Sequence, residues 1–164
     1  MRIEPKETPM NLTLVPTLWR RFVAVLESLQ PVAQLAARLY VAHAFFLSGL
    51  TKIRDWDTTL ALFSDEYHVP LLPPGLAAVM GTGGELVLPV LLALGLAGRF
   101  AALGLSVMNV VAVLSLAEIA PAALQQHQFW GSLLIGLALW GPGLLSLDRL
   151  ISARWGGRQG LAAH

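Results

Sequence analysis

Four long apolar stretches constrain the fold of this chain more than any other feature. Each approaches the roughly 20 residues that an α-helix needs to cross the hydrocarbon core of a bilayer. They cover residues 31–53, 74–97, 100–117 and 122–140. All are rich in Leu, Ala, Val and Gly and lack the alternation of barrel strands, so helices are the expected backbone solution in lipid. We therefore predict an all-α fold built on a four-helix transmembrane bundle.

The composition agrees with a membrane environment. Charged residues make up 13% of the 164 residues, about half of the roughly 25% found in a typical soluble domain. The net charge of +1 and the lack of a basic motif argue against a nucleic-acid partner. The absence of cysteine excludes disulfides, thiolate catalysis and iron–sulfur ligation by this chain. The expected partner is the lipid bilayer.

Shorter helices are predicted around the bundle. Residues 19–30 place apolar side chains near helical spacing, which fits either a short amphipathic helix at the interface or an early extension of the first span. A short helix is expected within residues 56–67, in the outer loop that joins the first two spans, and another within residues 146–154. We divide the chain into an N-terminal segment (1–30), a four-helix domain (31–148) and a basic tail (149–164).

The distribution of cations predicts the orientation. Basic residues accumulate in cytoplasmic loops, and threading four spans leaves Lys52 and Arg54 on one side of the membrane. The other side carries Arg2, Lys6, Arg20, Arg21, Arg99, Arg149, Arg154 and Arg158. Both termini should therefore be cytoplasmic, with the long first loop outside.

Two ionisable residues lie within the predicted spans, Arg38 and Glu85. Such residues cost at least about 2.5–3.5 kcal/mol on insertion scales, so they usually face the bundle interior and are paired. Counted at 1.5 Å per residue, Arg38 lies roughly 10 Å and Glu85 roughly 18 Å from the cytoplasmic side. We predict an ion pair between them, direct or through water. Both a chemical role and a purely structural role stay open.

The sequence around Glu85 favours a polar pocket. It reads Gly81-Thr-Gly-Gly-Glu-Leu-Val-Leu-Pro89. The glycines allow another helix to approach closely, and Pro89 removes the helical donor of the Glu85 carbonyl.

Further polar residues lie near the face of Arg38. Around the first span, Gly49 lies about 20° and Lys52 about 40° from Arg38, with Ser48 at the edge of that face. Lys52 is also close to the outer boundary, where an interface anchor is an alternative.

Asn109, near the middle of the third span, is expected to hydrogen-bond Glu85 or Arg38, or to act as interhelical glue. We thus take Glu85 and Arg38 as candidate catalytic residues. The candidate ligand-binding residues are Ser48, Gly49, Lys52 and Asn109. No metal-binding motif is present.

Several short motifs, taken together in their order and spacing, carry a resemblance to a protein family. They are Arg38 with Phe45-Phe-Leu-Ser-Gly-Leu-Thr-Lys52, Tyr67-His-Val-Pro-Leu-Leu-Pro-Pro74, Glu85-Leu-Val-Leu-Pro89, Leu94-Gly-Leu-Ala-Gly-Arg99 and Gly141-Pro-Gly-Leu-Leu-Ser-Leu-Asp148. Together they resemble the DoxX family of small bacterial membrane proteins over residues 38–150. The matching site positions are Arg38, Ser48, Gly49, Lys52 and Glu85.

The resemblance implies a four-helix bundle in the cytoplasmic membrane. Relatives of this type include a subunit of thiosulfate:quinone oxidoreductase and a membrane partner of a superoxide dismutase and a sulfurtransferase. Because the chain offers no evident haem or cluster ligands, an independent oxidoreductase is not expected.

The leading hypothesis is a membrane subunit or accessory of a redox, oxidative-stress or sulfur-oxidation system. A quinone or other amphipathic small molecule would bind near Arg38, Glu85 and Asn109. Arg38 would donate to a quinone oxygen and Glu85 would exchange a proton. One alternative is a non-catalytic scaffold that anchors redox partner proteins, and another is a small-solute or proton path. The small-residue faces also permit a homo-oligomer.

Overall fold

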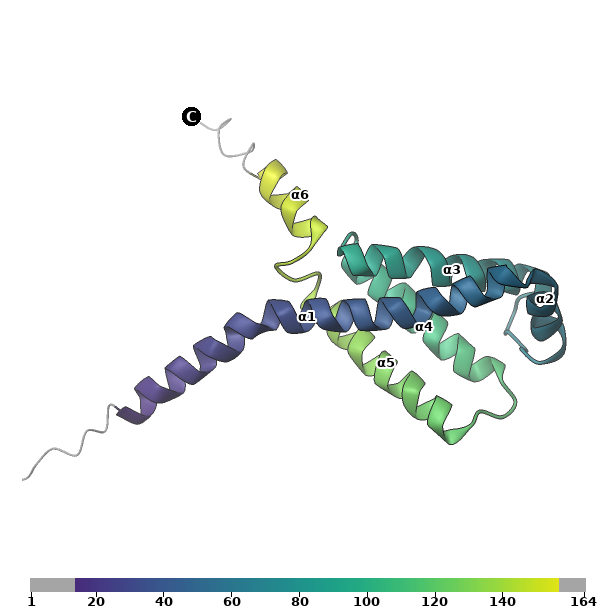
Figure 1. Ribbon diagram of the computed structural model, residues 1–164, viewed down its shortest axis with the longest axis horizontal. Helices are drawn as coiled ribbons and strands as arrows, with labels where there is room; N and C mark the ends of the chain where they lie inside the picture. Colours follow the sequence, from purple (N-terminus) through teal and green to yellow (C-terminus); the bar gives the residue numbers. More distant parts are fainter. Residues whose placement is uncertain (1–13, 157–164) are drawn as a thin grey trace, which may run out of the picture. The chain divides into compact units, whose positions relative to one another are not determined.

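The computed structural model describes residues 14–156, which form six helices and no strand (Figure 1). They are α1 (Leu14–Arg54), α2 (Trp56–Asp65), α3 (Pro74–Leu94), α4 (Gly98–Ser115), α5 (Pro121–Trp140) and α6 (Leu147–Gly156). The predicted all-α class is confirmed. The ends of the predicted N-terminal segment and basic tail, residues 1–13 and 157–164, lie outside the described residues.

The chain divides into two compact units, Met1–Gln30 and Pro31–His164. In the first unit, the described part of α1 exposes several large apolar side chains, and the Trp19 and Phe22 rings lie 5.8 Å apart. In the second unit, the predicted outer-loop helix appears as α2. The second unit contains every residue of the candidate site.

Local sequence signals set the helix ends. Asp55 caps α2, since its carboxylate accepts hydrogen bonds from the Thr58 backbone N–H at 3.0 Å and from the Thr58 hydroxyl at 2.7 Å. α3 ends three residues earlier than predicted because Gly95 adopts a left-handed conformation with φ of 65°. α5 begins at Pro121, where a missing N–H costs no helical hydrogen bond.

In the second unit, α4 packs against both α3 and α5, and α2 packs against α3. α2 and the α4–α5 connection lie at the same end of the unit (Figure 1). The core is formed by alanine and larger aliphatic side chains with one aromatic ring: Val41, Phe45, Leu92, Ala101, Ala102, Leu105, Leu134 and Leu137. Ala101 and Ala102 are fully buried, so the backbones of neighbouring helices can approach closely there.

The outer face of α4 is apolar along its whole length. Its exposed residues follow helical spacing and are between 54% and 66% exposed: Phe100, Leu103, Val107, Val110 and Leu114. The polar Asn109 is instead buried on the opposite, inward side. A contiguous apolar stripe of this size is unfavourable in water. The helix therefore has its polar group inside and an apolar face outside, an arrangement suited to contact with lipid.

Two of the four predicted spans, α3 and α4, are long and apolar enough to cross a membrane. Only 28% and 33% of their most apolar segments are buried, which differs from the mostly buried core helix of a soluble protein. α1 and α5 do not reach the same level of apolarity. Polar residues interrupt them, including Arg38 in α1 and residues 125–128 in α5.

Candidate functional site

Lys52 of α1 and Glu85 of α3 form an ion pair between the helices. The Lys52 Nζ lies 2.7 Å from Glu85 Oε2 and 3.0 Å from Oε1, and it also donates to Ser48 Oγ at 2.8 Å. The side chains are 17% and 14% exposed. Because the three N–H groups of the ammonium have three acceptors, its hydrogen-bonding capacity is filled. The pair combines Glu85 with two of the predicted ligand-binding residues.

Gly49 brings the two helices together at this level. A Cβ added there would lie 3.1 Å from Glu85 Cβ and 3.0 Å from Leu86 Cγ. The structure therefore places Gly49 at the α1–α3 contact. The absence of a side chain at Gly49 allows Lys52, three residues later, to reach the carboxylate of Glu85.

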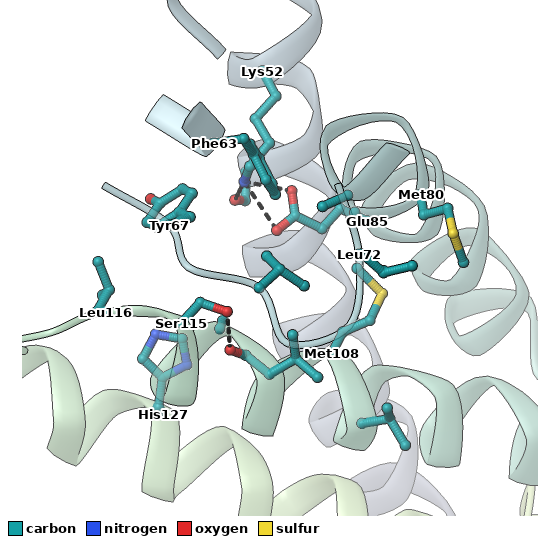
Figure 2. Close-up of a pocket in the computed structure, with 17 residues that line it drawn as sticks. Lys52, Phe63, Tyr67, Leu72, Met80, Glu85, Met108, Ser115, Leu116 and His127 are labelled. Carbon is teal, nitrogen blue, oxygen red and sulfur yellow. Dashed lines mark hydrogen bonds and ion pairs between the residues drawn. The ribbon is translucent and has the colours of Figure 1, made fainter. Parts of the chain in front are cut away.

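A cavity of about 340 Å³ adjoins this ion pair. In Figure 2, Lys52, Glu85, Phe63 and Tyr67 lie on one side, and Ser115, Leu116 and His127 gather on the other. Apart from Ser48, the remaining lining is apolar: Val69, Leu72, Ala77, Met80, Gly81, Val107, Met108, Val111 and Ala112. An apolar cavity with a few convergent polar groups is typical of a small-molecule site. It lies at the end of the unit that carries α2.

The segment after α2 covers part of the cavity. The His68 backbone N–H donates to the Ser115 carbonyl at 2.9 Å, which ties this segment to the end of α4. The rings of Tyr67 and Phe63 meet edge to face, with centroids 5.1 Å apart. Burial raises the pKa of Tyr67 above its ordinary value of 10.0, and the nearby carboxylates Glu66 and Glu85 raise it further. The phenol therefore stays protonated at neutral pH.

His127 of α5 is held by Asn109 of α4. The Asn109 Nδ2 donates to the His127 carbonyl at 2.9 Å, and Asn109 Oδ1 lies 2.8 Å from His127 Nδ1. Trp130 packs edge to face on the imidazole, with centroids 5.2 Å apart. The prediction that Asn109 bonds Glu85 or Arg38 is therefore wrong. Its amide is committed to α5, as in the interhelical alternative.

Arg38 does not pair with Glu85, so that prediction is also wrong. Arg38 is only 2% exposed, and its guanidinium donates to the Pro142 carbonyl at 2.8 Å and to the Leu145 carbonyl. It is absent from the cavity lining. The physical reason is the register of two antiparallel helices. With Gly49 opposite residues 85 and 86, Arg38 lies beside Gly95, about ten residues or roughly 15 Å beyond Glu85.

The surroundings of Arg38 form a second polar cluster, at the α3–α4 turn. Asp148 accepts from the backbone N–H groups of Ala97 at 2.9 Å and Gly98 at 3.0 Å. Its own N–H donates to the Gly95 carbonyl at 3.0 Å. A carboxylate at the first N–H groups of α4 is a favourable helix cap. This cluster explains the 141–148 motif as a segment that closes one end of the bundle.

The glycines near Glu85 serve different neighbours. A Cβ at Gly81 would lie 3.3 Å from Phe63, and a Cβ at Gly84 would lie 2.6 Å from Met108 Sδ. Both residues allow close packing, as predicted. Gly83 has nothing within 4 Å of an added Cβ. The predicted close approach at Gly83 is therefore wrong, because it faces away from the neighbouring helices.

Sequence reasoning missed three polar residues of the cavity: Tyr67, Ser115 and His127. His127 belongs to a polar run near the start of α5, residues 125–128, from which we predicted no site residue. His127 could have been found through its partner Asn109, because an asparagine inside an apolar helix needs a hydrogen-bonding partner on a neighbouring helix.

One of three comparisons with known proteins gives a match, which covers the motifs between Arg38 and Arg99. No curated protein and no solved structure matches the chain. The family model of DoxX matches residues 33–118, which include Arg38, Ser48, Gly49, Lys52, Glu85 and Asn109. The match covers about half of the chain, including all of α2, α3 and α4. The helices α3 and α4 are apolar and mostly unburied, and the family model matches half of the chain. This chain is therefore a membrane protein that belongs to the DoxX family.

Proposed function

We propose that this protein binds a quinone or a similar small amphipathic molecule in the cavity beside Lys52 and Glu85. It would serve as a membrane subunit or accessory of a redox, oxidative-stress or sulfur-oxidation system. The observation that supports this proposal most directly is the cavity, about 340 Å³, in which apolar walls from α2, α3, α4 and the segment after α2 surround a charged pair. That volume is at the small end of the range for ligand sites, about 300–1,000 Å³. It suits a ring-sized head group whose apolar tail extends into lipid.

The proposed topology has four crossings, by residues 31–54 of α1 and by α3, α4 and α5. Both termini would be cytoplasmic, in a bacterial inner membrane. The cation asymmetry supports this orientation, since Lys52 and Arg54 are at one end and Arg99, Arg149 and Arg154 are at the other. Of the first pair, Lys52 is neutralised by Glu85. The cavity then lies in the outer half of the bilayer.

Lys52 and Glu85 would supply the charged groups of the site. Arg38 would have no direct part in it, because its hydrogen bonds go to the segment that includes Pro142 and Leu145. The ion pair is neutral as a whole, so it favours a neutral polar head group over an anion.

A photoreactive benzoquinone with a short alkyl tail tests the proposal on full-length protein in lipid nanodiscs. We expect saturable labelling, identified by mass spectrometry, on residues that line the cavity. Val111→Trp places an indole into the cavity and should abolish the labelling. Val110→Trp is the matched control, because Val110 is 54% exposed on the outer face of α4.

Equal labelling of the Val111→Trp and Val110→Trp proteins would contradict a site in this cavity. The absence of saturable labelling in the native protein would contradict ligand binding altogether and would favour the scaffold alternative.

A further inference from the structure

The orientation of the Asn109 amide is fixed by its two contacts with His127. The His127 carbonyl can only accept a hydrogen bond, so the group that approaches it at 2.9 Å is the Asn109 NH₂. The amide oxygen therefore faces the imidazole, 2.8 Å from Nδ1. Gly131 leaves room for this arrangement, because a Cβ there would lie 3.3 Å from Asn109 Nδ2.

The position of the amide oxygen shows which imidazole nitrogen of His127 carries a proton. An amide oxygen accepts hydrogen bonds and cannot donate them, so Nδ1 of His127 carries hydrogen. Neutral histidine protonated at Nδ1 has a free lone pair on Nε2. The neutral form is favoured here because a charge inside a membrane helix is costly. Since His127 lines the cavity, the cavity contains a hydrogen-bond acceptor at Nε2 (Figure 2).

The other polar groups of the cavity have most of their donors engaged. The Lys52 ammonium donates to Ser48 and to both oxygens of Glu85. The Ser115 hydroxyl donates to the Val111 carbonyl at 2.6 Å. The lone pairs of Glu85 and Ser115 are still available, and the Tyr67 hydroxyl can both donate and accept. The cavity therefore offers more free hydrogen-bond acceptors than free donors, which favours a ligand that carries its own donor group.

We infer that the cavity selects the reduced, hydroxyl-bearing form of a quinone-type molecule, with its O–H donating to Nε2 of His127. The oxidised form presents carbonyl oxygens, which would meet the Nε2 lone pair without a proton between them. This inference rests on the proposed function and specifies which redox form binds. Asn109 acts as a positioning residue, since it holds the tautomer that makes Nε2 an acceptor.

The test compares menadiol and menadione, which share one ring skeleton, on full-length protein in nanodiscs under anaerobic conditions. Empty nanodiscs correct for partition into lipid. One hydrogen bond with a neutral partner predicts that menadiol binds about 2- to 10-fold more tightly. Nitrogen NMR of isotope-labelled histidine gives a second readout. The Nε2 resonance of His127 should be that of an unprotonated nitrogen and should shift when menadiol is added.

Two variants make the test specific. His127→Gln should remove the preference for menadiol and identifies the NMR resonance. Asn109→Leu should weaken the preference and allow a proton to populate Nε2. His43→Gln is the matched control, because His43 is an exposed histidine of α1 outside the cavity lining, and it should retain the preference.

The outcomes separate the two proposals. Saturable binding of both forms with equal affinity, or tighter binding of menadione, would overturn the selectivity and leave the proposed function standing. A native His127 resonance with hydrogen on Nε2 would also overturn the selectivity. No saturable binding of either form would refute the proposed function as well.

Discussion

Lys52 contacts both carboxylate oxygens of Glu85, and it does so from the last turn of α1 while Glu85 lies in the middle of α3. The two residues are 33 positions apart in the chain. The ion pair joins the helices on either side of α2 and forms one side of the cavity. Its energetic role can be separated from its role in ligand binding.

Removing one member of this pair should destabilise the protein more than removing both. Lys52→Met or Glu85→Leu leaves an unpaired charge and should lower the free energy of unfolding by about 1–3 kcal/mol, less than the roughly 3–5 kcal/mol of a fully buried pair because both side chains are partly exposed. The double variant should recover part of that loss. Thermal unfolding in nanodiscs measures this, and strictly additive losses would argue against coupling.

Gly95→Ala should destabilise the bundle. Gly95 has φ of 65°, and an added Cβ would overlap Arg38 Nη1 and approach Ser146. The left-handed backbone alone costs an alanine about 1–2 kcal/mol. Gly83→Ala is the control, since Gly83 is in α3 with open space around it and should gain about 0.5–1 kcal/mol from helix propensity. Similar unfolding temperatures for the two variants would contradict this account of Gly95.

Arg38→Met should loosen the segment that follows α5. The substitution leaves the carbonyls of Pro142 and Leu145 without their charged donor. Hydrogen bonds to charged groups contribute about 1.5–3 kcal/mol, so amide hydrogen exchange at Asp148 should accelerate at least about tenfold.

Arg99→Met is the control for Arg38→Met. The Arg99 side chain makes only a long 3.4 Å hydrogen bond, to the Leu139 carbonyl. Unchanged exchange at Asp148 in the Arg38→Met protein would contradict a role of Arg38 in closing this end.

Alkaline pH should weaken the cover of the cavity through Tyr67. Its folded-state pKa is raised above 10.0, mainly by burial. The unfolded chain therefore loses this proton first. The stability that the neutral, buried Tyr67 phenol contributes to the folded protein is fully present below pH 10, and it is lost as pH rises through the folded-state pKa.

The chain contains two tyrosines, so Tyr40→Phe leaves Tyr67 as the single phenol for a titration by ultraviolet absorbance. The midpoint should lie above 10.0 in the folded protein and return toward it on unfolding. Tyr67→Phe should reduce the loss of stability at high pH. A folded-state midpoint at or below 10.0 would contradict the burial of this phenol.

The sequence was sufficient to predict α2 to α6 and the shared face of α1. It left open whether residues 19–30 form a separate helix or extend the first span, and they belong to the continuous helix α1. Apolar length predicted α3, α4 and α5 to within a few residues, and Trp56–Asp65 was expected as a helix. The helical angle correctly put Arg38, Gly49 and Lys52 on one side of α1, since all three face α3 or its end.

The register along that face could not be obtained from the sequence. Depths counted from assumed membrane boundaries placed Arg38 near the level of Glu85. The α1–α3 register is set instead by the close contact at Gly49, a packing property that no single-helix pattern contains. Lys52, and not Arg38, is consequently the residue that pairs with Glu85. The pairing of His127 with Asn109 was missed for the same reason, because it depends on how α4 and α5 align.

The partners of Arg38 also have a consequence for biogenesis. Its acceptors come from residues that follow it by 104 and 107 positions. During synthesis, α1 is thus complete before the acceptors of its buried cation have been translated. That end of the bundle is completed only when the ribosome has passed Asp148. A chain interrupted before this point would leave the Arg38 guanidinium without these two acceptors.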